Sequence, residues 1–508
     1  MKNSLLFLFL ISSSLLLSQR QADAILIGNS FFSIPAAAPY ANSIITFDDT
    51  SLVSENASTP MVMSNFYSSA SYANKNGNLL FASNGWRLLN SFGEVLSYKL
   101  WHDDIPWPGE SPDTTLADLS RGPLFLPNPS DTNQVYLFYG EYIRNFLTQT
   151  IGYISKDVRF CYALLDVPSQ SLISQGNVIF EDTTSVSDMV ALRHGNGRDW
   201  WIYKSGVLSN QFYRGLLSVD GLSDFELITI AGIVPREQTY TLTHFTQDGN
   251  TMAHFSTFAS KYCQRYDIDR CTGNLSNPRE TDLNPMFRPA DFSNFILSPD
   301  GSKFYGFRLD YNDTTYLTGT YQYDFELDSL TYLSLDAPNL FLSPNNKEIY
   351  IITSIFGSGT VVNYFTAIEN PDSLGLACSV VTQKYPLQNG PIMLAAPNFA
   401  NYRLGPLVGS ECDPLSSNSL ALNNSPEPSL SVFPNPNKGL LQVRVAHVKS
   451  QVIDLIIYNN LGIQMFKTEY KNNSITIDLE SLNLSQGIYF VEVSNAEFIN
   501  RRKFIYTK

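Results

Sequence analysis

Side chains able to carry out chemistry are few and scattered in this sequence. The 508 residues include five histidines and five cysteines, and they hold no nucleophile elbow, zinc-binding helix motif, phosphate-binding glycine loop or EF-hand spacing. Asp267 and Asp269 lie two apart on one expected strand and offer the carboxylate oxygens that calcium binds, although such residues at a strand edge more often pair with an arginine. We therefore expect no metal ion and no cofactor, and we name no catalytic residue.

Four side chains remain as candidates for contact with a ligand: His194, His244, Trp101 and Trp107. The two histidines occupy similar points of repeated segments, where they either converge on a central channel or act as structural partners of a turn. The two tryptophans lie on a proline-rich stretch, residues 101–109, where their apolar ring faces could stack on sugars. Another pair, Trp200 and Trp201, is instead expected to pack between repeats.

The cysteines are too few to hold a chain of this length together, so the core must carry the fold. Cys263 and Cys271 flank a short segment and form our candidate disulfide. A second pair, Cys378 and Cys412, could clip the end of the same domain. Cys161 is then left over and is expected to be buried as a small hydrophobic residue.

A repeated unit must position these candidates. Residues 295–305 read as an apolar run, a tight Pro-Asp-Gly turn and an apolar-aromatic run, which is the pattern of a β-hairpin. Variants of this unit have their turns near residues 77, 127, 195, 248, 300, 345 and 397, a period of roughly fifty residues. Such a period is typical of radial sheet repeats, so we predict an all-β fold in which residues 25–412 form a six- or seven-bladed β-propeller.

The first residues have the pattern of a signal peptide. Lys2 precedes an apolar run, residues 5–17, and Ala22-Asp23-Ala24 supplies a small-x-small cleavage pattern. We therefore predict a signal peptide over residues 1–24, with a mature start near Ile25. No other stretch reaches about eighteen consecutive apolar residues, so we expect no transmembrane segment.

The charge of the chain restricts its partners. The net charge is −14, while residues 429–508 contain nine Lys and Arg against six Asp and Glu, so the acidic excess lies upstream of residue 429. Nucleic acids and anionic membranes require clusters of Lys and Arg. We therefore expect no nucleic-acid partner and a solvated extracellular protein.

Four motifs in the repeat region resemble those of secreted bacterial propeller proteins of WD40-like type: residues 195–201, 269–278, 295–301 and 397–405. The resemblance covers most of residues 76–412. It implies the propeller fold and export, and it carries no information about a ligand.

The C-terminal residues form a separate compact region. Residues 413–428 are rich in Ser, Asn, Leu and Pro, as is typical of a linker. Period-2 alternation then predicts strands at residues 441–445, 452–458, 464–469, 474–479, 487–493 and 502–506, which make a small β-sandwich.

This region, residues 429–508, resembles the type A C-terminal sorting domain of the type IX secretion system. The family pattern is carried by Pro434, Asn435, Pro436, Gly439, Gly462, Gly487, Tyr489 and Lys508. The resemblance implies an Ig-like fold, recognition by the type IX secretion machinery, export across an outer membrane, removal of the domain, and attachment to the cell surface or release.

Two classes of function follow for the exported propeller. In the first, it is a binding module for an extracellular ligand, a glycan or a protein, that contacts loops on one face of a rigid disc. In the second, it is a hydrolase or lyase that acts on extracellular glycans or peptides in the central channel. We favour the first because the sequence offers no nucleophile and no acid-base pair.

Overall fold

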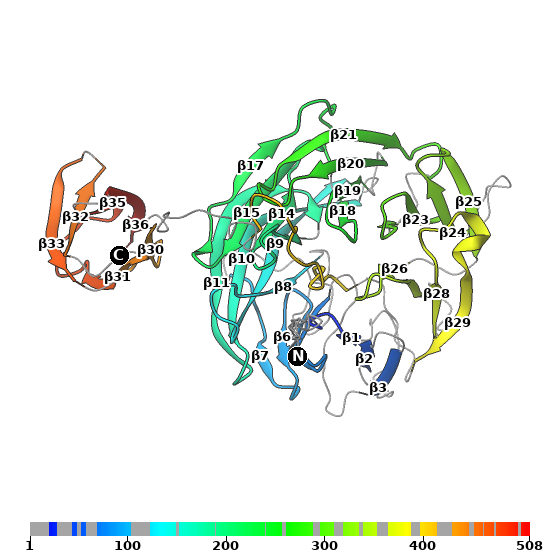
Figure 1. Ribbon diagram of the computed structural model, residues 1–508, viewed down its shortest axis with the longest axis horizontal. Coiled ribbons are helices and arrows are strands. Elements are labelled where there is room, and N and C mark those ends of the chain that lie inside the picture. The colour runs from blue at the N-terminus through cyan, green and yellow to red at the C-terminus, as the bar shows by residue number, and fades with distance from the viewer. Residues whose placement is uncertain are drawn as a thin grey trace, which may run out of the picture. The chain divides into compact units, whose positions relative to one another are not determined.

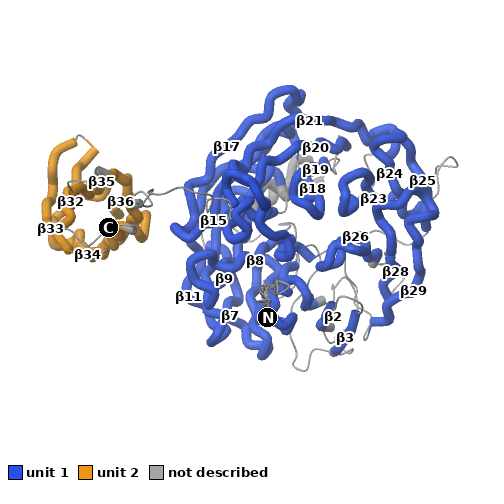
Figure 2. The backbone as a smooth tube through the Cα atoms, in the orientation of Figure 1, with its two compact units in different colours: residues 1–416 blue, residues 417–508 orange. Residues whose placement is uncertain are grey.

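The computed structural model describes residues 20–27, 43–47, 52–56, 69–102, 122–148, 152–187, 189–238, 240–256, 261–287, 295–308, 318–334, 339–352, 364–387, 397–413, 429–446, 452–460, 462–471, 474–495 and 499–507. The chain divides into two compact units, residues 1–416 and 417–508 (Figure 2). The described parts are strands and connecting turns, with one short 3-10 helix, η1 (Gly375–Cys378). Over these ranges no helix is long and apolar enough to cross a membrane.

The first unit is a ring of seven antiparallel sheets that follow one another in the order of the sequence (Figure 1). Their strands are β1 (Ala24–Ile27), β2 (Ser43–Phe47) and β3 (Leu52–Asn56); β4 (Ala70–Ala73), β5 (Leu79–Ser83), β6 (Leu88–Asn90) and β7 (Val95–Ser97); β8 (Leu124–Pro127), β9 (Gln134–Thr148), β10 (Gly152–Asp166) and β11 (Ser171–Thr184); β13 (Val190–Arg193), β14 (Trp200–Ser205), β15 (Gln211–Ser218), β16 (Gly221–Leu222) and β17 (Glu226–Thr229). The remaining sheets hold β18 (Tyr240–Phe245), β19 (Thr251–Ser256), β20 (Tyr262–Ile268) and β21 (Leu275–Asp282), joined in parallel by β12 (Val186–Ser187); β22 (Phe295–Leu297), β23 (Lys303–Arg308), β24 (Gly319–Asp324) and β25 (Ser329–Ser334); and β26 (Asn339–Leu342), β27 (Ile349–Ile352), β28 (Tyr364–Ile368) and β29 (Val380–Pro386). The predicted β-propeller is confirmed, and its described residues form seven blades.

The repeated turns join the first two strands of six of these sheets. In the hairpin between β22 and β23, the Ser298 N–H donates to the Lys303 carbonyl and the Gly301 N–H donates to the Ser298 carbonyl. The same pair of bonds recurs after Asn74, Asn128, His194, Thr246 and Ser343, with one residue fewer or more in the first two turns. Gly77, Gly197, Gly249, Gly301 and Asn346 stand at the equivalent position in five of these turns with φ between 57° and 82°. Glycine and asparagine adopt this left-handed conformation most easily. The turns can therefore be recognised in the sequence from these residue types.

One expected turn is wrong. Residues 397–413 form no strand, so no hairpin begins near residue 397. The seventh sheet is instead β1–β2–β3, which comes from the start of the chain.

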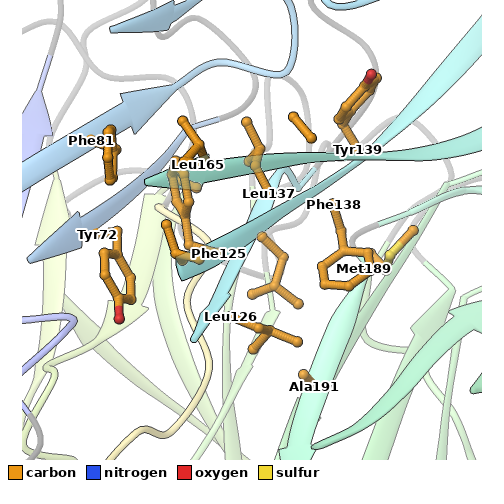
Figure 3. Close-up of a cluster of buried hydrophobic side chains, with 14 of the residues drawn as sticks. Tyr72, Phe81, Phe125, Leu126, Leu137, Phe138, Tyr139, Leu165, Met189 and Ala191 are labelled. Atoms are coloured by element: carbon orange, nitrogen blue, oxygen red, sulfur yellow. The ribbon is translucent and has the colours of Figure 1, made fainter. Parts of the chain in front are cut away.

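Apolar side chains between neighbouring sheets form the core. The largest cluster combines residues of β4–β7, β8–β11 and β13–β14 with Tyr402, and Figure 3 shows Phe81, Phe125 and Phe138 among the aliphatic side chains of this cluster. The first sheet packs on both neighbours, since Ile45 and Phe47 join Phe341 and Tyr350 in one cluster, while Leu26 joins the β4–β7 sheet in another. The ring therefore closes through side chains of β1–β3.

The second unit is a sandwich of two sheets that share one core. One sheet has the order β30 (Ser429–Phe433), β31 (Leu440–Ala446), β34 (Ser474–Asp478), and the other has the order β33 (Gln464–Tyr470), β32 (Ile453–Asn459), β35 (Gly487–Ser494), β36 (Ile499–Tyr506). Leu441, Leu455, Val491 and Phe504 are fully buried between them. The six strands expected from the sequence are confirmed to within three residues, and β30 is added.

The turn geometry generates a matched pair of substitutions. Gly301→Ala is expected to lower the free energy of unfolding by about 1–3 kcal/mol, because φ is +75° and the new Cβ would lie 2.5 Å from Thr246 Cγ2. Asn346→Gly, at the equivalent position, relieves a left-handed asparagine and is expected to change it by less than about 1 kcal/mol. Urea denaturation of the full chain measures both, and equal effects of the two substitutions would contradict this account of the turn.

Candidate functional site

Residues 397–413 run along the middle of the ring, beside the first strands of several sheets (Figure 1). At one end of this segment, Asn398 forms hydrogen bonds with the residues just before β4, β8 and β13, each of which is the first strand of its sheet. Its N–H donates to the Ser69 carbonyl at 2.8 Å, and its side-chain amide donates to the carbonyls of Pro123 and Met189 at 3.2 and 2.9 Å. Asn398 therefore ties three neighbouring sheets at one mouth of the ring.

Tyr402 lies halfway along this segment and is buried. Its hydroxyl donates to the Phe125 carbonyl at 2.6 Å, and its ring packs edge-on against Trp200 and Tyr72. The Arg193 guanidinium lies over the Trp200 ring and donates to the Tyr402 carbonyl at 3.2 Å. This part of the channel is thus filled by protein side chains.

Further along, the segment 397–413 reaches the opposite end of these strands, where the hairpin turns lie. The Leu407 N–H donates to the Gly195 carbonyl at 2.8 Å, in the turn that follows β13. A side chain at Gly195 would overlap Cys412, since a Cβ there would lie 2.3 Å from its Sγ. Arg270 donates to the carbonyls of both Arg193 and Gly405. Three of the motifs named above, residues 195–201, 269–278 and 397–405, therefore meet here and have a structural role.

The disulfide differs from the expected one. Cys271 bonds to Cys412 with 5.5 Å between their Cα atoms, so the pairings Cys263–Cys271 and Cys378–Cys412 are wrong. Cys263 lies on β20 and points into the core between sheets, while Cys378 is buried in another core cluster. Cys271 follows β20 on a turn that faces the segment 397–413. Cys161 is buried, as expected.

The two candidate histidines each tie one sheet to the next. His194 Nε2 donates to the Cys271 carbonyl at 2.9 Å, because its Nδ1 accepts the Asn196 N–H. His244 Nε2 lies 2.8 Å from the Phe295 carbonyl, and burial lowers the pKa of His244 to about 4. Both histidines are half-buried or buried structural donors, and they do not meet at a common site.

The tryptophans are also structural where they are described. Trp101 is 4% exposed, and its indole N–H donates to the Gly85 carbonyl at 3.0 Å, so its expected place on an exposed loop is wrong. Trp107 lies outside the described residues. Trp200 is fully buried, and Trp201 donates to the Arg270 carbonyl in the next sheet, so packing between repeats is confirmed for this pair.

Within the described parts of the chain, one cluster of metal-binding residue types lies at the β8–β11 sheet: His102, Glu141 and Cys161. The buried Glu141 carboxylate accepts the His102 N–H and lies 2.8 Å from His102 Nδ1. It also accepts a hydrogen bond from Arg159 at 3.1 Å, and Cys161 Sγ lies 4.0 Å from it. Imidazole, carboxylate and thiolate are zinc ligands, but here the carboxylate already has three nitrogen partners, one of which belongs to a guanidinium. The sequence analysis did not predict this cluster because its three residues lie far apart along the chain.

The expected calcium ligands have other partners. Asp267 pairs with Arg279, and Asp269 accepts hydrogen bonds from the Cys271 N–H and the Thr272 hydroxyl, each at 2.8 Å. Asp267 therefore pairs with an arginine, which was the alternative to calcium binding. Asp269 stabilises the turn that carries the disulfide.

In the second unit, residues 435–437, at and just after the Pro-Asn-Pro pattern, form hydrogen bonds with the last strand, β36. Asn435 Oδ1 accepts the Ile505 N–H at 2.8 Å. Asn437 is fully buried, and its backbone pairs with Ile505 and Thr507 at 2.8 Å. Asn437 did not stand out in the sequence, although it directly follows the Pro-Asn-Pro pattern.

The other residues of this pattern stabilise turns and the core. Gly439 donates to the Asn437 side chain at 2.7 Å, and Gly462 adopts a φ of +76° in the turn after β32. Gly487 begins β35, and Tyr489 is buried against Phe504. Lys508 lies outside the described residues.

Residues 431–507 match the family described as the secretion system C-terminal sorting domain. The C-terminal unit is a sorting domain. The chain therefore carries the signal of an exported protein that is displayed at the surface or secreted.

No curated protein matches the chain. Among solved structures, the chain is similar to a candidate 6-phosphogluconolactonase of Bacteroides uniformis, with 13% identity, 73% of this chain and 97% of that one covered, and a TM-score of 0.43. A periplasmic gluconolactonase of Pseudomonas aeruginosa shows 11% identity, coverage of 72% and 96%, and a TM-score of 0.36. PorZ, a surface component of the type IX secretion system of Porphyromonas gingivalis, shows 10% identity, coverage of 96% and 100%, and a TM-score of 0.17.

The filled channel generates a test on Tyr402. Tyr402→Ala is expected to lower the free energy of unfolding by about 3–5 kcal/mol through the cavity it leaves, and Tyr402→Phe by about 1–2 kcal/mol through the unpaired Phe125 carbonyl. Tyr98→Phe removes an exposed hydroxyl and serves as the control, with a change within about 0.5 kcal/mol. Urea denaturation measures all three, and a neutral Tyr402→Ala would mean that the segment does not fill the channel.

Burial of His244 predicts a loss of stability in acid. Its folded pKa of about 4 lies below the ordinary 6.5, so the unfolded chain takes up the proton first as pH falls. The free energy of unfolding should fall from about pH 6.5 towards pH 4, by up to about 3 kcal/mol for this residue. His244→Gln keeps a donor for the Phe295 carbonyl and does not titrate, so it should show a shallower pH dependence. An unchanged slope in this variant would contradict the assignment.

Proposed function

We propose that the type IX secretion machinery exports this chain by reading the sorting domain, and that the propeller then acts as a binding module at the cell surface or outside the cell. The observation that carries the proposal is the family match of residues 431–507. The ligand class we propose for the propeller is an extracellular glycan or protein.

The outer face of the four-stranded sheet supports recognition of the sorting domain. Ile488 pairs across the strands with Ile505, and Phe490 pairs with Lys503; these side chains point away from the buried core residues Tyr489 and Phe504. Ile488 is 45% exposed. The face combines apolar and basic side chains, and β36 is the edge strand of this sheet, covered at its end where the Asn437 backbone pairs with Ile505 and Thr507. An edge strand and an exposed apolar face are both features that partner proteins bind.

A binding role for the propeller is supported by how its candidate catalytic groups are used. His194 and His244 serve as donors between sheets, and residues 397–413 fill part of the channel. In the cluster beside the β8–β11 sheet, the His102 ring nitrogen lies against Glu141, while Cys161 is fully buried. This is not the arrangement of a nucleophile with its base, so we give the hydrolase or lyase alternative no residues.

Removal of the sorting domain tests the export half of the proposal. We expect a chain lacking residues 429–508 to remain in the periplasm with its propeller folded, because the propeller and the sorting domain have separate cores. Protease treatment of whole cells and fractionation of the medium would measure this. Surface display of the truncated chain at the level of the full chain would overturn the proposal.

Paired substitutions in the full chain locate the recognised face. Ile488→Asp places a charge on the outer face of the four-stranded sheet and should reduce the surface fraction by about tenfold, equivalent to about 1.4 kcal/mol of lost recognition. Thr476→Asp places the same charge at an exposed position of β34, in the other sheet, and should leave export unchanged. Equal export of the two variants would exclude this face.

A further inference from the structure

Residues 20–24 belong to the folded propeller, although the small-x-small pattern places them in the signal peptide. Ala22, Asp23 and Ala24 are 5%, 0% and 1% exposed. Ala24 is the first residue of β1 and pairs with Thr46 on β2. These values are those of core residues, and a cut after Ala24 would remove them from every mature molecule.

The backbone of this segment bonds to β2 of the first sheet and to β4 of the next sheet. The Asp23 carbonyl accepts the Phe47 N–H at 2.7 Å, and the Gln21 carbonyl accepts the Ala73 N–H at 2.8 Å. The Arg20 guanidinium donates to the Phe47 carbonyl at 2.9 Å. Loss of the segment would leave two N–H groups of the propeller without these acceptors, and unpaired buried amides are costly.

The Asp23 carboxylate also joins the two ends of the propeller. Arg403, 380 residues away, donates to both of its oxygens at 3.0 Å. Arg20 binds the same carboxylate at 2.5 Å. Removing one member of a buried charge pair is costly, and a cut after Ala24 would remove the carboxylate that Arg403 binds through both oxygens.

We propose that signal peptidase cleaves before Arg20, so that the mature chain keeps residues 20–24. The Ala22-Asp23-Ala24 pattern is then a structural sequence and not the cleavage site. Upstream small residues that could stand next to the cut are Ser12, Ser13, Ser14 and Ser18. This inference rests on the proposed export, because a chain that is not exported meets no signal peptidase.

The mature N-terminus is measured on the full chain recovered from the cell surface or the medium. Digestion with a glutamyl endopeptidase yields an N-terminal peptide that ends at Glu55, and its mass identifies the first residue. We expect a first residue between 13 and 20. A peptide that begins at Ile25 would overturn the inference while leaving export intact. An uncut chain found only in the cytoplasm would overturn the proposed export and this inference with it.

A second readout does not depend on the N-terminal peptide. Asp23→Asn should lower the melting temperature of the exported protein by a few degrees if residue 23 is present, because the ion pair with Arg403 is weakened. Asp224→Asn, at an exposed position, is the matched control and should leave it unchanged. If residues 20–24 were cut away, the Asp23→Asn protein would be identical to the wild-type mature protein, and an unchanged melting temperature would overturn the inference.

Discussion

A ring of sheets has to close, and in this propeller closure depends on the contact between Asp23 and Arg403. Among the described residues, β1, β2 and β3 pair only with one another, so no strand from the end of the propeller completes the first sheet. The two ends of the ring are joined by side chains instead: an ion pair whose aspartate is fully buried, and apolar clusters on both sides of β2. The segment that carries Arg403 adds bonds to four further sheets, and in this way one buried carboxylate contacts both ends of the propeller.

The parts of the fold that could be predicted are those set by local backbone chemistry. In five of the six hairpin turns a glycine or asparagine has a positive φ, so these turns recur visibly in the sequence, and alternation reveals the sandwich strands. Contacts between distant segments leave no such mark. The Cys271–Cys412 bond joins residues 141 apart, and nothing near Cys263 signals that strand alternation turns it into the core. Residues 397–413 resemble the start of a repeat because some of them, such as Ala400 and Tyr402, are buried between the sheets, although the segment does not pair as a strand.

The candidate ligand-binding residues were misread for one physical reason. Where sheets pack side by side, backbone carbonyl groups at the ends of the strands have no partner within their own sheet. Each of these carbonyl groups needs a hydrogen-bond donor from elsewhere. His194, His244, Trp101 and Trp201 all donate to such carbonyls. A repeated polar or aromatic residue in a propeller therefore first has to be tested as a donor between strands. The Pro-Asn-Pro pattern is different, because the family resemblance identified it, and the structure then placed Asn435 beside the last strand.

The disulfide has a mechanical consequence. It fastens Cys412, one residue before the expected linker, to the turn after β20, while the hydrogen bonds of residues 397–407 lie upstream of that point. Tension applied to the chain beyond residue 413 is therefore borne by a covalent bond and does not peel this segment out of the ring. A force or a cut on the C-terminal side of Cys412 can therefore act while the propeller remains closed.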